Sequence, residues 1–214
     1  GRLLARAEIQ RILQNRLAVE STLRTEPAIE RQPVEAPIVI TGLGRTIARR
    51  DILRCLVNRI EMQSWRQRHP EIAKQAIERP LFVVGMGRTG TTILHDLLAQ
   101  DPANRVPMQW ELMYSVPPPE TASYDTDPRI ERVRREITVM DEADPAFPHM
   151  HELAADLPTE CIYVFAHQFA SDMFVGEFHV PSYAIWTGTT DLFPAYRYHR
   201  RFLQLLQWRH PGRW

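Results

Sequence analysis

The sequence predicts an α/β fold in which helix predominates and a parallel sheet begins at one short strand. Two observations support this prediction. Residues Leu81–Val84 form a continuous apolar run that leads into the glycine-rich turn GMGRTGTT and then into the apolar helical pattern TTILHDLLAQ. A buried strand, a tight turn and a helix in this order are typical of one unit of a parallel sheet. Helical spacing of apolar residues also recurs along much of the remaining chain.

This helical spacing predicts further helices over about residues 3–23, 48–69, 128–140, 158–174 and 194–208. In the second of them, Ile52, Leu53, Leu56 and Ile60 are expected to share the buried face. The proline-rich stretch VPMQWELMYSVPPPET, residues 106–121, is expected to be an ordered loop that covers part of the protein.

The first part of the chain recurs in the second. Asn15-Arg16 matches Asn58-Arg59, Pro27 matches Pro70, Pro37 matches Pro80, and Gly42–Thr46 matches Gly85–Thr89. The first copy is expected to form a short strand and a tight turn at Gly42–Thr46, but no complete helix of its own follows that turn. We therefore divide the chain into residues 1–46, a helix plus a partial repeat of the turn unit, and residues 47–214, the main domain.

The composition excludes some classes of function. The chain has 214 residues, and its 26 Lys and Arg balance its 26 Asp and Glu. Nucleic-acid binders normally carry a basic excess, so DNA and RNA are not expected partners. No apolar run reaches the roughly 18 residues of a transmembrane helix. The charged N-terminal segment lacks the apolar centre of a secretory signal. Two cysteines, Cys55 and Cys161, are too few for a disulfide framework, which favours reduced thiols in the cytoplasm.

The turn GMGRTGTT is predicted to bind an anion. Its glycines allow backbone N–H groups, together with the positive end of the following helix dipole, to point at one place. Thr91 and Thr92 add hydroxyl donors, and Arg88 adds a permanent positive charge that can hold two oxygens at once. A plain strand-to-helix turn, whose glycines serve only packing, remains the alternative.

The turn departs from the phosphate loop of nucleotide-hydrolysing enzymes, which reads G-x-x-x-x-G-K-[ST]. Gly85, Gly90 and Thr92 occupy matching positions, but Thr91 stands in place of the lysine. Kinases and hydrolases use that lysine and a bound Mg²⁺ on the phosphates. A nucleotide kinase or hydrolase is therefore the less favoured interpretation, and an anion held without a metal is favoured.

The turn and several companion segments resemble the N-terminal portion of bacterial, actinobacterial-type sulfotransferases. The companions are RHPEI, DPANR, WEL, YDTDPRI, LPTECI and the final YHRRFLQLLQWRHPGRW. The resemblance implies a P-loop-like three-layer fold, with 3′-phosphoadenylyl sulfate (PAPS) as donor and no metal. It implies transfer of a sulfuryl group to a hydroxyl of a small-molecule, sugar or lipid acceptor.

The resemblance also implies roles for individual residues. The 5′-phosphosulfate of PAPS is expected to be held by Gly87, Arg88, Thr89, Gly90, Thr91 and Thr92. Arg88 is expected to stabilise developing charge rather than donate a proton, because the pKa of arginine exceeds about 12. The family's 3′-phosphate site is expected beyond Trp214, so the domain is expected to be truncated at its C-terminal end. A truncated binding relic without catalytic activity is therefore a further alternative.

A general base must take the proton of the acceptor hydroxyl, and Glu111 is the first candidate. It follows the helix of the turn, where the chain is expected to return to the same edge of the sheet. An ion-pair partner of an arginine is the alternative role for Glu111. His149, His151 and Trp110 are expected to contact the acceptor. No third ligand accompanies the two histidines, so no metal site is expected. The amphipathic N-terminal helix makes a homo-oligomer conceivable.

Overall fold

The computed structural model describes residues 42–87, 89–143, 145–146, 148 and 152–214. Residues 46–214 form one compact unit, and residues 1–45 form a second unit. The fold described below is that of the larger unit. The helix predicted over residues 3–23 and the first copy of the strand lie outside the described residues.

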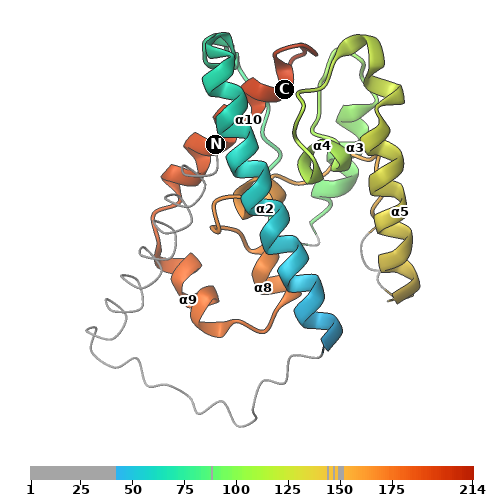
Figure 1. Ribbon diagram of the computed structural model, residues 1–214, viewed down its shortest axis with the longest axis vertical. Coiled ribbons are helices and arrows are strands. Elements are labelled where there is room, and N and C mark those ends of the chain that lie inside the picture. The colour runs from blue at the N-terminus through green and yellow to red at the C-terminus, as the bar shows by residue number, and fades with distance from the viewer. Residues whose placement is uncertain (1–41, 88, 144, 147, 149–151) are drawn as a thin grey trace. The chain divides into compact units, whose positions relative to one another are not determined.

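The described part of the chain is helical (Figure 1). Its elements are α2 (Gly42–Arg68), η1 (Pro70–Lys74), α3 (Thr91–Ala99), α4 (Gln109–Met113), η2 (Thr121–Thr126), α5 (Pro128–Ala143), α7 (Ile162–Ala166), α8 (Met173–Glu177), α9 (Pro181–Thr189) and α10 (Phe193–Gln207). The helices predicted after the glycine-rich turn, over about residues 128–140 and over about residues 194–208 are found as α3, α5 and α10.

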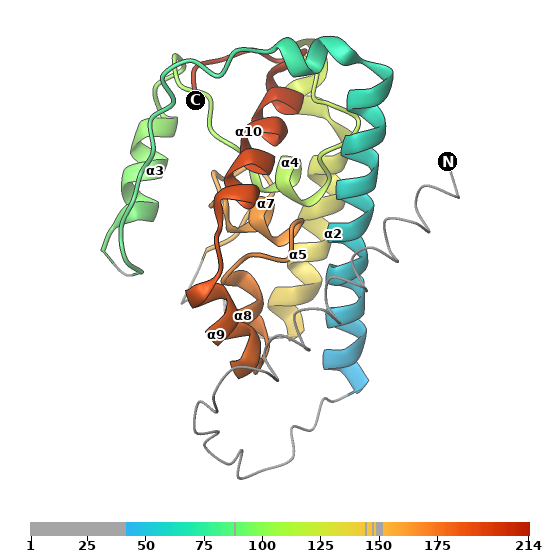
Figure 2. The same ribbon diagram turned by 90° about the vertical axis from the view of Figure 1, so that its left-hand side faces the viewer.

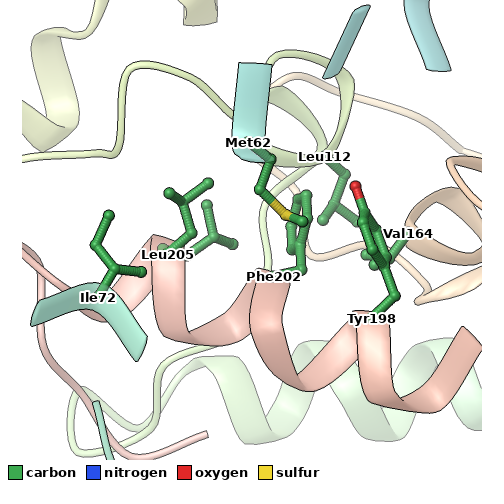
Figure 3. Packing of buried hydrophobic residues seen from close by; sticks show 8 residues of the cluster. Met62, Ile72, Leu112, Val164, Tyr198, Phe202 and Leu205 are labelled. Atoms are coloured by element: carbon green, nitrogen blue, oxygen red, sulfur yellow. The ribbon is translucent and has the colours of Figure 1, made fainter. Parts of the chain in front are cut away.

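The main core is built around α10. Its buried residues lie at spacings of three and four, the pattern of one helix face: Tyr198, Phe202, Leu205 and Leu206. They pack against Met62 of α2, Ile72 of η1, Leu112 of α4 and Val164 of α7. Figure 3 shows Met62 and Leu112 directed toward Phe202. α10 therefore holds together segments that lie far apart in the sequence.

The 3₁₀ helix η1 is fixed to α10 by a glutamine. The Gln204 side-chain amide donates hydrogen bonds to the carbonyls of Ala73, at 3.2 Å, and Gln75, at 2.8 Å. Lys74 lies between these two residues and is exposed. Ile72 of the same helix is fully buried, so η1 is held by both apolar packing and hydrogen bonds.

Two smaller clusters complete the packing. One joins α4 to α5 through Trp110, Met113, Val133, Ile137 and Ala155. The other joins α2, α7 and α8 through Cys55, Ala166, Met173 and Phe174. Both cysteines of the chain are free thiols, and burial raises the pKa of Cys55 to about 12.

The buried face predicted for α2 was wrong for Ile52 and Leu53, whereas Leu56 and Ile60 are half-buried. Ile52 is 39% exposed and Leu53 is 46% exposed. The face that α2 does bury contains Asp51, Cys55, Asn58 and Met62. Its polar members have partners, because the Asp51 carboxylate pairs with Arg54 at 3.1 Å and the Asn58 amide donates to the Met113 carbonyl at 2.9 Å. Apolar periodicity alone cannot detect polar residues that are buried in this way.

Two segments predicted as a turn and a loop contain helix in the structure. The expected turn at Gly42–Thr46 is the beginning of α2. A helix that is already nucleated gains one hydrogen bond per added residue, which offsets the roughly 1 kcal/mol cost of each glycine. The expected loop over residues 106–121 contains the short helix α4, all of whose residues are buried.

The single helix predicted over residues 158–174 is divided into α7 and α8. Phe169 lies between them with φ of 53°, a left-handed conformation that an α-helix cannot include. The Ser171 hydroxyl donates to the Ile162 carbonyl at 2.6 Å and accepts from the Met173 N–H at 3.2 Å. These hydrogen bonds satisfy backbone groups that a continuous helix would have used.

The segment predicted as a buried strand is extended but exposed. No β-strand occurs among the residues that the structure describes. Leu81, Phe82 and Val84 are 61%, 57% and 88% exposed. The pairing in this region consists of single contacts: Leu81 N–H donates to the Trp214 carbonyl at 2.9 Å, and Asn104 forms a parallel bridge with Arg213. The burial predicted for this strand is therefore wrong for the part of the chain that the structure describes, where no neighbouring strand covers it.

Candidate functional site

The glycine-rich turn forms a compact loop at the N-terminus of α3. The Thr89 hydroxyl donates to the Met86 carbonyl at 2.6 Å. A Cβ atom on Gly85 would lie 2.7 Å from both Thr89 Oγ1 and Thr91 Cγ2, so only glycine fits there without a shift. Gly90 precedes the first residue of α3 with φ of 88°, a conformation that favours glycine. Gly85 and Gly90 thus have separate conformational reasons to be glycine.

The N-terminus of α3 presents backbone donors. Gly90 caps the helix without a side-chain hydrogen bond, and the first turn contains no acidic residue. The first N–H groups of a helix have no partner inside it, and the helix dipole is positive at this end. Thr91 is half-buried and Thr92 is exposed. The structure therefore brings Gly87, Thr89, Gly90, Thr91 and Thr92 together, whereas Arg88 lies outside the described residues.

Figure 2 shows α3 to one side of the group formed by α2, α4, α5, α7 and α10. None of its residues is buried, and Ile93 and Leu97 are 68% and 64% exposed. The Asn104 side-chain amide donates to the Leu98 carbonyl at 2.9 Å and ties the end of α3 to the following chain. The loop is thus accessible from solvent.

Glu111 lies in α4 and is fully buried. Its Oε1 atom accepts a hydrogen bond from Arg105 Nη2 at 2.6 Å, and its Oε2 atom accepts from the Met108 N–H at 3.0 Å. Both carboxylate oxygens are therefore engaged inside the protein. The ion-pair role that the sequence left open for Glu111 is the one found in this structure. An acceptor hydroxyl cannot reach the carboxylate unless this region opens.

A second carboxylate, that of Glu160, acts electrostatically on the helix of the loop. Glu160 is exposed, and its charge acts on His95 of α3. Burial lowers the pKa of His95, while the charges of Asp96 and Glu160 act in the opposite direction. Sequence reasoning did not select Glu160. Its placement depends on the pairing of residues 107–110 with residues 155–159, which includes the antiparallel bridge between Met108 and Pro158.

Arg105 is the other residue that sequence reasoning did not select. It is 6% exposed and pairs with Glu111. Its guanidinium lies 4.2 Å from the centre of the Trp214 ring. The segment DPANR contains no periodicity that would mark an arginine as buried, so no sequence signal identifies this residue.

Of the three residues expected to contact the acceptor, the structure describes Trp110 alone. Trp110 is 1% exposed and packs in the α4–α5 cluster, with the Arg129 guanidinium 4.6 Å from its ring centre. His149 and His151 lie outside the described residues. Two further aromatic residues, Phe178 and Tyr183, are partly buried and pack against the α2–α7–α8 cluster.

Within the described ranges, no group of three or more His, Cys, Asp and Glu side chains is arranged to hold a metal ion. Among the helices between residues 42 and 214, with the gaps stated above, none has both the length and the hydropathy needed to cross a membrane.

Comparison with known proteins places this geometry in a family. Residues 80–206 match the model of the sulfotransferase family. Sulfotransferase STF9 from Mycobacterium avium has 34% sequence identity and a TM-score of 0.73, and the match covers 84% of this chain and 46% of that one. Sulfotransferase STF1 from Mycobacterium tuberculosis H37Rv has 35% identity and a TM-score of 0.70, with 82% and 48% covered. The chain thus spans about half the length of each. No curated protein matches the chain.

Proposed function

Because the chain belongs to the sulfotransferase family, we propose that it transfers the sulfuryl group of PAPS to a hydroxyl of a small-molecule, sugar or lipid acceptor. The observation that carries this proposal is the loop at the N-terminus of α3. Because the N-cap residue of α3 is Gly90, no side chain occupies the first backbone N–H groups of the helix. These N–H groups and the threonine hydroxyls offer an anion several donors from one direction. This arrangement suits the 5′-phosphosulfate of the donor.

In this proposal, residues Gly87–Thr92 hold the 5′-phosphosulfate. Arg88 stabilises the negative charge that develops on the bridging oxygen as the bond to sulfur breaks. Because arginine remains charged at every working pH, Arg88 does not donate a proton. The absence of lysine from the loop supports the proposal against a nucleotide kinase, which requires that lysine.

The general base has two candidates. Glu111 is the candidate from the sequence, but its burial and its pairing with Arg105 separate it from any acceptor in this structure. Glu160 is exposed and lies near enough to α3 to act electrostatically on His95. A general base must be accessible to the acceptor hydroxyl whose proton it takes. The exposed carboxylate of Glu160 meets this requirement, so we favour Glu160.

For the acceptor, we propose that His149 and His151 contact it and that Trp110 supports the acceptor site from within the core. A cytoplasmic setting fits the two free thiols of the chain. The proposed reaction requires no metal ion.

The donor site is tested by calorimetric binding of 3′-phosphoadenosine 5′-phosphate, with and without Mg²⁺. We expect binding that does not depend on Mg²⁺ and that an Arg88→Ala variant loses. Arg134→Ala is the matched control, because Arg134 is an exposed arginine on α5. A requirement for Mg²⁺, or a preference for ATP, would indicate a kinase or hydrolase instead.

The base is tested by comparing Glu160→Gln with Glu111→Gln in transfer from radiolabelled PAPS to a panel of phenol, sugar and lipid hydroxyls. Loss of a general base typically lowers kcat by about 10²–10⁴-fold. We expect this loss in Glu160→Gln, with unchanged affinity for 3′-phosphoadenosine 5′-phosphate. We expect Glu111→Gln to lower stability first, because it leaves the buried Arg105 charge without its counter-ion. A stable Glu111→Gln protein with lost turnover would assign the base to Glu111.

A further inference from the structure

We propose, on the basis of the function proposed above, that Arg105 is a positioning residue that fixes the glycine-rich loop, residues 85–92, relative to α4. This loop is called the donor loop below. Arg105 belongs to neither element. It lies between them and contacts the last segment of the described chain, residues 206–214, at several points.

The contacts with residues 206–213 use both the backbone and the side chain. The Arg105 N–H donates to the Arg213 carbonyl at 2.7 Å. The guanidinium donates from Nε to the His210 carbonyl at 2.9 Å and from Nη2 to the Leu206 carbonyl at 3.2 Å. A Cβ atom on Gly212 would lie 2.7 Å from Arg105 Cβ, so a glycine is needed for this close approach.

Trp214 connects Arg105 to the segment that precedes the donor loop. The Arg105 guanidinium stacks 4.2 Å from the Trp214 ring centre, and the indole N–H of Trp214 donates to Gln207 Oε1 at 2.8 Å. The Trp214 carbonyl accepts the Leu81 N–H at 2.9 Å. Leu81 begins the extended segment that leads into the loop, and that segment is exposed, with no strand of the described residues over it. In this proposal, the hydrogen bond between Leu81 and Trp214 helps to place the loop.

Glu111 holds Arg105 on the other side. Arg105 Nη2 lies 2.6 Å from Glu111 Oε1, and both side chains are buried. Direct contacts thus run from Leu81 through Trp214 and Arg105 to Glu111 in α4. A lysine cannot replace Arg105 in this role, because a single ammonium group cannot reproduce the planar fork that donates in several directions and stacks on the indole.

The test compares Arg105→Lys with the wild type and with Arg134→Lys, which makes the same change at an exposed arginine. Three quantities are measured: the free energy of unfolding, the affinity for 3′-phosphoadenosine 5′-phosphate, and the hydrogen-exchange rate of the Leu81 amide. We expect Arg105→Lys to weaken binding by roughly tenfold or more, since small displacements of a site are costly, and to accelerate exchange at Leu81. Arg134→Lys should change neither the affinity for 3′-phosphoadenosine 5′-phosphate nor the exchange rate at Leu81.

A double variant, Arg105→Met with Glu111→Met, separates positioning from stability. Replacing both members of a buried ion pair by apolar residues is often neutral or stabilising. We expect this variant to fold stably while its binding stays weak and its Leu81 amide exchanges rapidly.

Two results would overturn the proposal. One is an Arg105→Lys variant that loses only stability and keeps the wild-type exchange rate at Leu81. The other is a double variant with wild-type affinity and exchange. If the wild type itself binds no 3′-phosphoadenosine 5′-phosphate, the proposed function fails, while exchange at Leu81 still decides whether Arg105 fixes the loop.

Discussion

At the scale of single residues, His167 shows how burial and hydrogen bonding act on one titratable group. Asn58 Nδ2 lies 3.2 Å from His167 Nε2, and the Tyr198 hydroxyl lies 3.2 Å from His167 Nδ1. Because the amide donates, Nε2 accepts, and this assigns the ring proton to Nδ1. Burial, followed by the charge of Arg54, lowers the pKa of His167 to about 3. The folded protein therefore holds this histidine neutral.

This predicts a loss of stability in acid. The unfolded chain binds a proton at His167 near its ordinary pKa of about 6.5, whereas the folded chain does not until about pH 3. The contribution of His167 to the free energy of unfolding is fully present above pH 6.5. It is lost as the pH falls toward 3, at up to about 1.4 kcal/mol per pH unit. Urea unfolding between pH 7 and pH 4 measures this slope. His167→Gln should reduce it, and the exposed Gln63→Ala should not. Equal slopes in all three proteins would contradict the neutral histidine.

At the scale of elements, α10 and α3 have opposite relations to the core. α10 contributes Tyr198, Phe202, Leu205 and Leu206 to the main cluster, whereas α3 buries none of its residues. Both were predicted from their apolar residues. Apolar content predicted that each segment is a helix, but it did not predict how much of each helix is covered, because coverage depends on the neighbouring segments.

A matched pair of substitutions tests this contrast. Leu205 is fully buried and Leu97 is 64% exposed. Leu205→Ala should lower the free energy of unfolding by about 2–5 kcal/mol through the lost burial and the cavity left behind. Leu97→Ala removes the same atoms and should change it by no more than about 0.5 kcal/mol. Denaturant unfolding of both variants measures the difference. Similar losses in the two would mean that α3 is covered by other parts of the protein.

At the scale of the whole larger unit, stability is expected to be unevenly distributed. α10 packs against α7 and η1, and α4 packs against α5 and α7. The extended segment before the loop and α3 stand outside these clusters (Figure 2). Amide hydrogen exchange should therefore be at least about tenfold slower in α10 than in α3. Uniform protection along both helices would contradict this distribution.

The sequence predicted α3, α5 and α10 and the loop before α3, because each has a strong local signal in its apolar spacing, prolines or glycines. Family membership was likewise predicted and is confirmed by the match over residues 80–206. The burial of Asn58 on α2 could not be predicted, since its partner, the Met113 carbonyl, lies far along the chain. The ion pair of Asp51 with Arg54 is local and does not indicate that Asp51 is buried. The contacts of Arg105 with the Leu206 and His210 carbonyls are also distant in the chain. The ion pair of Glu111 was one of the two roles that the sequence left open for it. The parallel sheet stays a prediction, because the described residues contain no strand.

Lys74 offers a spectroscopic use of this architecture. It is the one lysine of the sequence, and it lies exposed in η1 between two carbonyls that Gln204 of α10 holds. Apart from the amino terminus of the chain, an amine-reactive dye therefore has one place to attach. In a variant that keeps Trp208, next to the end of α10, as its single tryptophan, energy transfer from Trp208 to a dye at Lys74 would report when α10 separates from η1.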